Sequence, residues 1–584
     1  MADERTALAR LEDLEDRVGD PTGGELAGRA RPRPPARRAA SVRSGGGGGG
    51  LLRSNLVVAA GTTLSRLTGL LRVVVFGIII GKQALADAYL IGNETPNIVY
   101  ELLLGGVLSA TLVPLFTSLL HREEPQAAGR HAALSEGERA TNAVITVTLA
   151  ALAVVTLLAV LAAPLIFGFY SINTEGTVDP ETFRQVGTQL TRVFLVQIFF
   201  YGAAGLFNAY LNSRRHFFAA SWSPILANVI VIVTLLTLPR QTWQVTDALT
   251  NDRLRLTLAL GTTLGIAAMA LSLAPAARAA GLRYRPVFEP SHPAVRRLLT
   301  MSAWTLGYVV CNQVVIAIVR NLSGPGSGGA TAYFYAYTFF VLPHGLLAMS
   351  IATTFVPELA RAVARRDRVA FCARASLGVR MIALLTLPAG AALFVLRRPL
   401  LGLLLQYGEF SAQDAAQTAR VLGGFAVGLV GFSVYLFALR GFYAHHDTRT
   451  PFVLNAGQCL LNIAFAFAFV GEWGVLGLSA AFALSYVLAA LWALQVLTYK
   501  VRGFPLRDTL ASLFRIGLAA VLGGEVAWFA ARHVGGNTGG GAIARLLAGG
   551  AAGLAVYIGV LVLQRAPEVA TLRAVATRRA GHGT

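Results

Sequence analysis

Residues 61–77 read GTTLSRLTGLLRVVVFG, which is apolar enough to enter a lipid bilayer although two arginines lie near its middle. An arginine at the centre of a membrane helix costs roughly 2.5–3.5 kcal/mol on insertion scales. Other stretches are more apolar still, such as NAVITVTLAALAVVTLLAVLAAPLIFGFY at 142–170. Because about 20 apolar residues span the hydrocarbon core as a helix, both stretches predict membrane-spanning helices.

The composition of the whole 584-residue chain indicates the same class. Apolar residues make up 55% of the chain and charged residues only 14%, whereas soluble domains carry about 25% charge. The net charge of +20 lies mostly in short loops and at the two ends. No basic soluble domain is therefore expected, and nucleic acid is excluded as a partner. We predict an all-α polytopic membrane protein.

Apolar blocks of membrane length predict about 14 spans. The spans begin near residues 54, 87, 140, 184, 217, 253, 296, 329, 369, 411, 449, 473, 507 and 541. Residues 1–53 are rich in proline, glycine and charge and contain no apolar core of a signal peptide, which predicts a disordered tail.

An internal repeat organises the spans. Residues 87–116 (DAYLIGNETPNIVYELLLGGVLSATLVPLF) resemble residues 331–359 (TAYFYAYTFFVLPHGLLAMSIATTFVPEL). A second, looser pair joins 207–228 to 440–462. Such repeats are the usual architecture of secondary transporters, with the site between the lobes near mid-membrane. We expect six-helix lobes at 54–279 and 296–500, two further helices at 507–564 and a tail at 565–584.

The charges of the loops predict the orientation. With a cytoplasmic N-terminus, the inside loops and the C-terminal tail hold most of the loop arginines, whereas the outside loops at 172–181, 321–329 and 471–474 are poor in them. The loops near Arg253 and Arg397 are exceptions. The positive-inside rule therefore predicts that both termini are cytoplasmic.

The first span carries a polar stripe. At 100° per residue, one arc of about 120° holds a set of polar and small residues, while Leu67 and Leu71 lie mostly outside it. The members of this stripe are Thr62, Ser65, Arg66, Gly69 and Arg72. Gly69 leaves room for a bend or for a close ligand.

The second span carries a stripe of opposite charge. Asp87, Glu94 and Glu101 follow one another at intervals of seven residues, and Asn97 falls in the same arc. Two neighbouring charged stripes predict a hydrated or ligand-filled cavity, because charge facing lipid is not tolerated. Helix breaks for gating are expected at five positions. They are Gly69, Pro96, Gly106, Pro224 and Pro343.

Two interpretations of the stripes remain open. The arginines Arg66 and Arg72 could simply neutralise Asp87 and a glutamate in a structural ion-pair network. Alternatively the arginines bind an anion, because the planar guanidinium holds phosphate oxygens bidentately. The substrate-binding candidates are then Ser65, Arg66, Arg72, Asp87 and Asn97. Glu94 and Glu101 are candidates for binding a coupling cation, Na⁺ or H⁺.

Motifs for catalysis are not found. Neither of the two lysines, Lys82 and Lys500, sits in a Walker A sequence. The three cysteines are far apart in apolar segments, and His445 and His446 are expected to be solvated loop residues. We therefore predict a transporter and not an enzyme, without cofactor or metal, driven by membrane potential or an ion gradient.

Several motifs together resemble the MurJ (MviN) family. These are TLSRLTGLLR at 63–72, DAY at 87–89, PN at 96–97, VP at 113–114, AYLNSRRHFFAASWSPILAN at 209–228, LLQYGEF at 404–410 and FYAHHDTRTP at 442–451. The resemblance implies 14 helices of the MOP exporter superfamily in the bacterial cytoplasmic membrane. It also implies that Ser65, Arg66, Arg72 and Asp87 lie in a central cavity.

The resemblance implies a substrate too. The family flips lipid II, the undecaprenyl-pyrophosphate-linked precursor of peptidoglycan, so the expected partners are this lipid, membrane lipids and cell-wall synthesis proteins, with the chain a monomer. This chain has Tyr100 and Thr338 where family members often carry arginine, and Gly105 where they carry glutamate. The alternatives are a flippase for another polyprenyl-diphosphate glycan, a MATE-like ion-coupled exporter and a non-transporting cell-wall scaffold.

Overall fold

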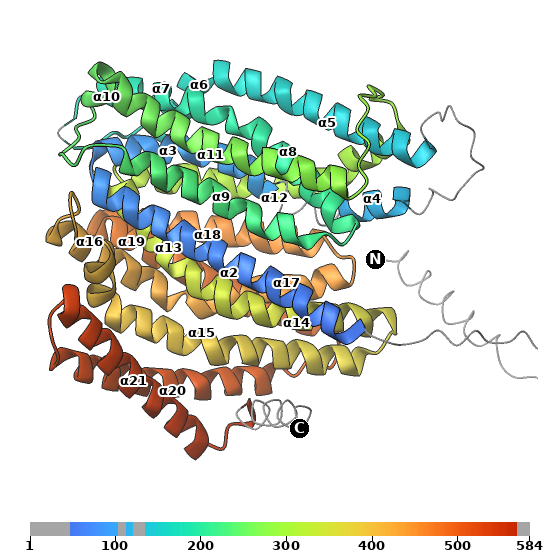
Figure 1. Ribbon diagram of the computed structural model, residues 1–584. Helices are drawn as coiled ribbons and strands as arrows, with labels where there is room; N and C mark the ends of the chain where they lie inside the picture. The colour runs from blue at the N-terminus through green and yellow to red at the C-terminus, as the bar shows by residue number, and fades with distance from the viewer. Residues whose placement is uncertain (1–46, 103–111, 121–134, 177, 569–584) are drawn as a thin grey trace, which may run out of the picture. The chain divides into compact units, whose positions relative to one another are not determined.

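The computed structural model describes residues 47–102, 112–120, 135–176 and 178–568 (Figure 1). Every regular element in these ranges is a helix. In hydrocarbon a helix satisfies its own backbone hydrogen bonds, so apolar blocks of this length adopt no other single-segment form. The predicted all-α fold class is confirmed.

Helices α2 to α11 come from the first half of the chain. In order they are α2 (Gly47–Ile80), α3 (Ala84–Leu102), α4 (Val113–Leu120), α5 (Glu136–Leu161), α6 (Ala163–Tyr170), α7 (Pro180–Leu195), α8 (Gln197–Ser213), α9 (Phe217–Leu236), α10 (Asp247–Thr250) and α11 (Asp252–Ala279). The apolar block at 142–170 is thus divided at Ala162, between α5 and α6.

The second half of the chain continues the pattern. It contains α12 (Pro293–Leu322), α13 (Gly329–Pro343), the π-helical turn η2 (His344–Ala348), α14 (Met349–Ala364), α15 (Arg368–Leu404), α16 (Ala412–Val427), α17 (Leu429–Ala444), α18 (Arg449–Trp473), α19 (Val475–Lys500), α20 (Leu506–Arg532) and α21 (Gly539–Leu563).

Eleven helices or helix pairs in the described part of the chain are long and apolar enough to cross a membrane. The bent pair α16 and α17, with 45° between its halves, makes a twelfth. Helix α3, which carries the acidic residues, and helix α12 begin near two further predicted starts. With these two the total would be the predicted 14, a number that stays a prediction.

Polar caps at the loops define several helix starts. Ser135 and Glu138 form a capping box at the start of α5, and Ser411 and Asp414 form another at the start of α16. Asp367 accepts a hydrogen bond from the backbone of Ala370 at the start of α15. These side chains satisfy backbone N–H groups that the first turn of a helix leaves without partners.

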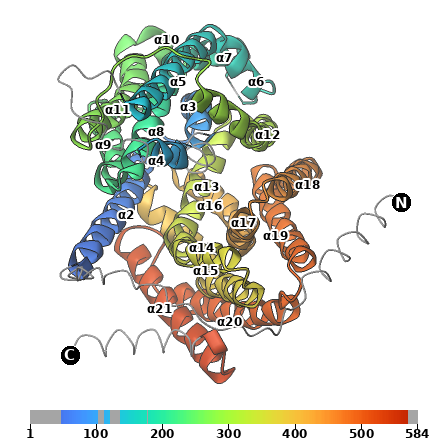
Figure 2. The same cartoon turned by 90° about the vertical axis from the view of Figure 1, so that its right-hand side faces the viewer.

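The helices form two packed groups, seen end-on in Figure 2. Helices α5 to α11 pack with α3 on one side, and α13 to α19 pack on the other, with α20 and α21 against α15. Aromatic rings fill the second group. Among Phe340, Phe425, Phe432 and Phe482, five of the six pairs of ring centroids lie within 5.8 Å. Following the sequence repeat, we call α2 to α11 the N-lobe and α12 to α19 the C-lobe.

The connections at the two ends of the helix bundle differ in amino-acid composition. The glycine-rich end, at the left of Figure 1, consists of the connections at 81–83, 171–179, 323–328, 405–411 and 533–538. The arginine-rich end, at the right, consists of those at 214–216, 280–292, 365–367, 445–448 and 501–505.

The two copies of the sequence repeat share backbone features at two places. Helix α3 and helix α13 start at corresponding positions, and the second pair gives the same turn between α8 and α9 as between α17 and α18. At the start of the first pair the copies touch each other, because Asp87 bonds to Thr331, its counterpart in the alignment. Contact between equivalent residues is what a two-fold relation between repeats produces.

Candidate functional site

The polar stripe of α2 faces inward. Leu67 and Leu71 expose 49% and 50% of their surface, as side chains facing lipid would, whereas Ser65, Arg66 and Arg72 are half-buried. Both arginines lie well inside the apolar segment Val57–Ile80. The helix therefore turns its charged side toward protein and its leucines outward, as the stripe predicts.

Arg66 lies against the C-lobe. Its guanidinium occupies the space in which a β-carbon at Gly345 would sit, so the two groups are in direct contact. Gly345 belongs to η2, where the helix widens into one π-helical turn directly after Pro343. The neighbouring His344 is buried, and its Nδ1 atom lies 2.9 Å from the Ser433 hydroxyl. The broken helix of the C-lobe thus provides the surface for the arginine of the N-lobe.

Neither arginine has a counter-charge among the described carboxylates, and the side chain of Glu101 lies outside the described residues. Within the described ranges, no carboxylate forms an ion pair with Arg66 or Arg72. The structural ion-pair network that the sequence left open is thus not formed by these side chains. Two half-buried guanidinium groups without counter-charge are suited to bind an anion, because buried charge is costly unless it is paired.

Ser65 lies beside a small cavity. The cavity has a volume of about 360 Å³ and is lined by residues of α2, α8 and α9, including Ser65, Asn212 and Pro224. One turn further along α9 than Pro224, the Asn228 amide donates to the Ser65 carbonyl at 3.2 Å and to the Thr68 hydroxyl at 3.1 Å. Of the predicted site residues, Ser65 and Pro224 are therefore brought together.

Asp87 is placed elsewhere, at the glycine-rich end. Its carboxylate is fully buried and accepts hydrogen bonds from the backbone N–H groups of Gly326, Gly328 and Thr331 at 2.8–2.9 Å, and from the Thr331 hydroxyl. These donors belong to the first turn of α13 and the loop before it, where helix N–H groups need acceptors and negative charge is favourable. In this conformation Asp87 binds the C-lobe and presents no atom to a ligand.

Glu94 also faces the C-lobe. It forms an ion pair with Arg320 of α12, whose guanidinium donates in addition to the Ala330 carbonyl at 3.2 Å. The Arg320 side chain is 6% exposed and that of Glu94 23%. A pair this enclosed stabilises only if both members stay together, because removing one leaves an uncompensated charge. The candidate for ion coupling is thus occupied by an arginine in this conformation.

Asn97 points back into the N-lobe, although the sequence placed it in the same arc as the carboxylates. Its carbonyl oxygen accepts from the Tyr201 hydroxyl of α8 at 2.8 Å. The side chain of Glu101 and the whole of Gly106 lie outside the described residues. The five predicted substrate-binding residues therefore do not lie together. Ser65, Arg66 and Arg72 lie on α2. Asp87 binds the start of α13, and Asn97 binds Tyr201 within the N-lobe.

Three of the predicted helix breaks are absent from this conformation. Helix α2 continues through Gly69, α3 through Pro96 and α9 through Pro224. A proline is tolerated inside a membrane helix because neighbouring groups satisfy the freed carbonyl. A break does occur at Pro343, where α13 ends and η2 begins.

The sequence interpretation missed Arg320, Thr331 and Gly345. Thr331 could have been found, since the repeat aligns it with Asp87 and equivalent residues near a two-fold axis meet. Arg320 lies directly before the predicted outside loop at 321–329, and it was not considered among the candidate residues. Gly345 gave no signal, because a glycine in an apolar helix is common in membrane proteins.

Comparisons with known proteins agree with this geometry. The family model described as "Lipid II flippase MurJ" matches residues 77–539. The probable lipid II flippase MurJ of Haemophilus influenzae is 28% identical over 490 residues, covering 80% of this chain and 90% of the relative. The lipid II flippase MurJ of Burkholderia cenocepacia is 26% identical over 488 residues, covering 82% and 90%.

Solved structures establish the same fold. A lipid II flippase MurJ in an inward closed conformation matches with a TM-score of 0.71 at 19% identity, covering 87% of this chain and 99% of its own. A multidrug resistance MATE family transporter of the MOP superfamily, in an inward-facing conformation, matches with a TM-score of 0.60 at 14% identity, covering 76% and 96%. By the family match over most of its length, this chain belongs to the MurJ family.

Proposed function

We propose that this chain moves the headgroup of lipid II from the cytoplasmic to the outer leaflet of the bacterial cytoplasmic membrane by alternating access. The observation that carries the proposal is the pair of arginines, Arg66 and Arg72, within an apolar helix and without counter-charge among the described side chains. The two named relatives are lipid II flippases, and lipid II is a diphosphate. A guanidinium holds phosphate oxygens in bidentate geometry and replaces their hydration.

The polyprenyl tail would stay in lipid while the headgroup crosses. Helices α20 and α21 pack on α15 and expose large apolar side chains, among them Phe514 at 74%, Phe529 at 63% and Leu547 at 68%. Such a surface is suited to lipid chains. No water-exposed path is needed for the tail, so only the polar headgroup requires the arginines.

The closed glycine-rich end would be the outer gate. Asp87 and Glu94 of α3 bind the C-lobe there, and Lys82 lies 3.4 Å from Asp414. Opening of this end toward the outside requires these contacts between the lobes to separate. The same movement would close the opposite end and change the contact between Arg66 and η2. The arginine-rich end would then face the cytoplasm, which agrees with the positive-inside rule.

The energy for each cycle would come from the membrane. Moving one net charge across 100 mV is worth about 2.3 kcal/mol. Separation of Glu94 from Arg320 would also free a carboxylate, which could bind H⁺ or Na⁺ in the outward state. Coupling of transport to an ion gradient would thus depend on the Glu94–Arg320 ion pair, which forms when this end closes and separates when it opens.

The test is an assay of lipid II headgroup accessibility on the outer surface of cells depleted of their own flippases. The chain is expected to restore accessibility, and Arg66→Gln or Arg72→Gln to abolish it at unchanged membrane abundance. Arg240→Gln, which removes an exposed cation from the loop between α9 and α10, controls for loss of charge alone and should retain activity. No restoration by the intact chain would refute lipid II as the substrate.

A flippase for another polyprenyl-diphosphate glycan is a second candidate, and one observation favours it. Thr338, at a position where relatives often carry arginine, uses its hydroxyl for the Phe334 carbonyl at 2.9 Å and offers nothing to an anion. In that case the intact chain fails with lipid II, yet both arginines remain essential for a different diphosphate lipid. Tolerance of both arginine substitutions would instead favour an exporter of the MATE type.

A further inference from the structure

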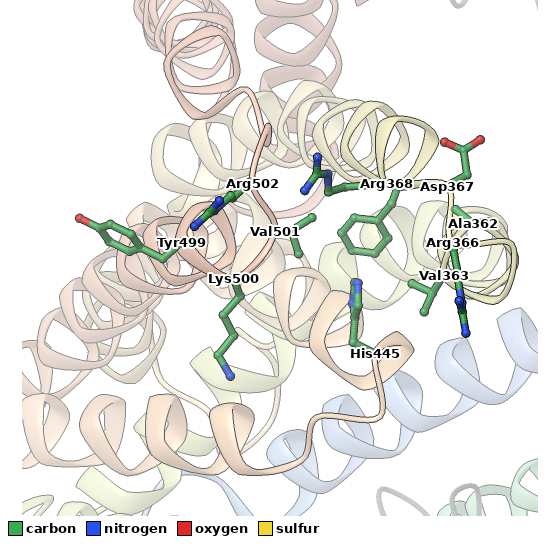
Figure 3. Close-up of a pocket in the computed structure, with 11 residues that line it drawn as sticks. Ala362, Val363, Arg366, Asp367, Arg368, His445, Tyr499, Lys500, Val501 and Arg502 are labelled. Atoms are coloured by element: carbon green, nitrogen blue, oxygen red, sulfur yellow. The ribbon is translucent and has the colours of Figure 1, made fainter. Parts of the chain in front are cut away.

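A second cationic pocket lies at the arginine-rich end, far along the chain from Arg66 and Arg72 (Figure 3). It has a volume of about 520 Å³ and is formed where α14 meets α15 and where α17 and α19 end. Its polar lining is mainly basic. The basic members are Arg366, Arg368, His445, Lys500 and Arg502.

The acidic groups near this pocket are already engaged. Asp367 caps α15 through the N–H of Ala370 at 2.9 Å, and Figure 3 shows its carboxylate turned away from the pocket centre. Asp447 accepts from the Lys500 ammonium at 2.6 Å. In the part of the chain that the structure describes, Arg368 and Arg502 have no ion-pair partner. The pocket therefore gathers positive charge that its own carboxylates leave uncompensated.

The imidazole of His445 is held in a fixed orientation. Its Nδ1 lies 3.0 Å from the Gly441 carbonyl, and its ring packs edge-on against Phe371 with centroids 4.6 Å apart. A carbonyl only accepts, so Nδ1 carries the proton and Nε2 is left for the pocket. In Figure 3 the Arg368 side chain extends toward the segment of Val501 and Arg502.

Topology alone does not explain this arrangement. The positive-inside rule needs arginines in loops, but it requires neither a pocket nor an oriented imidazole. The surroundings of the pocket suit the edge of a bilayer: Tyr499 in its lining is 75% exposed, and the adjacent Val369 is 80% exposed. Tyrosine is enriched where hydrocarbon meets headgroups, so an exposed tyrosine in the lining fits a pocket at the depth of lipid phosphates.

We propose that this pocket binds the phosphate of an anionic phospholipid headgroup, with Arg368 and Arg502 as the ligands. A phosphodiester brings the counter-charge that the arginines lack and takes bidentate hydrogen bonds from them. The bound lipid would hold the ends of α15, α17 and α19 together. This site is separate from the stripe of α2 and stands whatever the chain transports.

The test uses the full chain in nanodiscs of phosphatidylcholine with a series of phosphatidylglycerol fractions, and native mass spectrometry counts the phosphatidylglycerol that stays bound. The double variant Arg368→Gln with Arg502→Gln is expected to weaken retention at least tenfold. The matched control, Arg278→Gln with Arg283→Gln, removes two exposed cations from the same end of the N-lobe and should change retention less than twofold.

Three results would overturn the proposal. They are equal loss in the control pair, undiminished retention in the pocket pair, and displacement of the lipid by 10 mM inorganic phosphate, which would assign the pocket to a soluble phosphate. Arg366→Gly guards against misfolding, because it removes a lining cation while relieving the positive φ of 55° at that residue. This variant should fold at least as well as the parent chain and retain less lipid.

Discussion

The two ends of the molecule use left-handed backbone for different purposes. At the glycine-rich end the residues with positive φ are glycines, including Gly81, Gly326, Gly328 and Gly408. At the arginine-rich end most of them are basic residues. Within the described ranges these are Arg215, Arg366, His446 and Arg565, with φ between 51° and 61°.

Close approach of backbone carbonyls from the other lobe explains the four glycines just named. A β-carbon at Gly408 would collide with the Ile78 carbonyl of α2, and the next residue, Glu409, donates its N–H to that same carbonyl at 3.0 Å. Here backbone of the C-lobe lies directly on backbone of the N-lobe. Any side chain at this position would hold the lobes apart, so the closed state requires glycine.

Charge explains the cations. Each follows the last turn of a helix and forms the paired hydrogen bonds of a Schellman motif, as Arg215 does to Asn212 and His216 does to Leu211. The left-handed conformation costs a residue with a β-carbon roughly 1–2 kcal/mol. A cation at a helix C-terminus recovers about 0.3–1 kcal/mol. The arginine-rich end therefore has basic residues at positions where their backbone conformation is unfavourable. The glycine-rich end instead has residues without side chains, which allows the two lobes to touch.

The largest effect on this contrast is expected from Asp87→Ala. The substitution removes the acceptor for three backbone N–H groups of the α13 start, and each unsatisfied buried donor costs about 1–3 kcal/mol. We expect the glycine-rich end to open and transport to be lost. Labelling of a cysteine placed at Ser323, which is buried in the closed state, by a membrane-impermeant thiol reagent would measure the opening.

Thr331→Val is the matched control for Asp87. It removes only the hydroxyl donor and leaves the three backbone bonds, so it should change labelling much less than Asp87→Ala. If both variants label equally, the carboxylate does not hold this end closed.

A smaller effect is expected from Gly408→Ala, which tests close approach directly. The added methyl group meets the Ile78 carbonyl and should destabilise the closed state by about 1–3 kcal/mol, as overpacking does. Gly474→Ala separates strain from collision, because Gly474 has φ 55° but nothing within 4 Å of the added carbon. Equal shifts of the thermal unfolding midpoint in both variants would show that only backbone strain matters.

Sequence patterns predicted the helices well because hydrophobic length and loop charge are local properties. The predicted starts near 217, 329 and 449 coincide with those of α9, α13 and α18. The inward direction of the α2 stripe was equally local, since the arc that holds Arg66 follows from 100° per residue.

Contacts between the lobes could not be predicted in the same way. The sequence placed Asp87 and Glu94 on one face but could not say that the first meets a helix N-terminus and the second an arginine 226 residues away. Both contacts depend on how two lobes close, which no periodicity within one lobe encodes. The alignment of the repeat held part of that information, because it paired Asp87 with Thr331.

At the arginine-rich end, lowering the pH should reveal a modest contribution of ionised Asp447 to the free energy of unfolding. Burial raises the pKa of this carboxyl, but hydrogen bonds from Lys500 and Thr450 outweigh it and lower the pKa to about 2. Stability from the ionised form is thus complete above the unfolded pKa of about 3.9 and is lost as the pH falls toward 2.

The size of this contribution is about 1 kcal/mol, since half of the Lys500 side chain is in solvent and screened. The unfolding midpoint of detergent-solubilised chain at pH 7 and pH 3 measures it. The midpoint of the parent chain should fall more between these pH values than that of Asp447→Asn. Identical falls would show that the Lys500 contact does not stabilise the fold.

The smallest effect, and the sharpest for the contrast between the ends, is expected from Arg215→Gly. Glycine relieves the left-handed strain but loses the interaction of the cation with the helix C-terminus and adds freedom to the unfolded chain. We expect a net gain in stability below about 1 kcal/mol. The same motif closes α11 with glycine, so Gly281→Arg should cost a similar amount. Chemical denaturation of both variants measures the two changes. A loss of stability in Arg215→Gly would mean that the charge itself outweighs the strain, and that this end is selected for its cations in the folded state as well as for its orientation in the membrane.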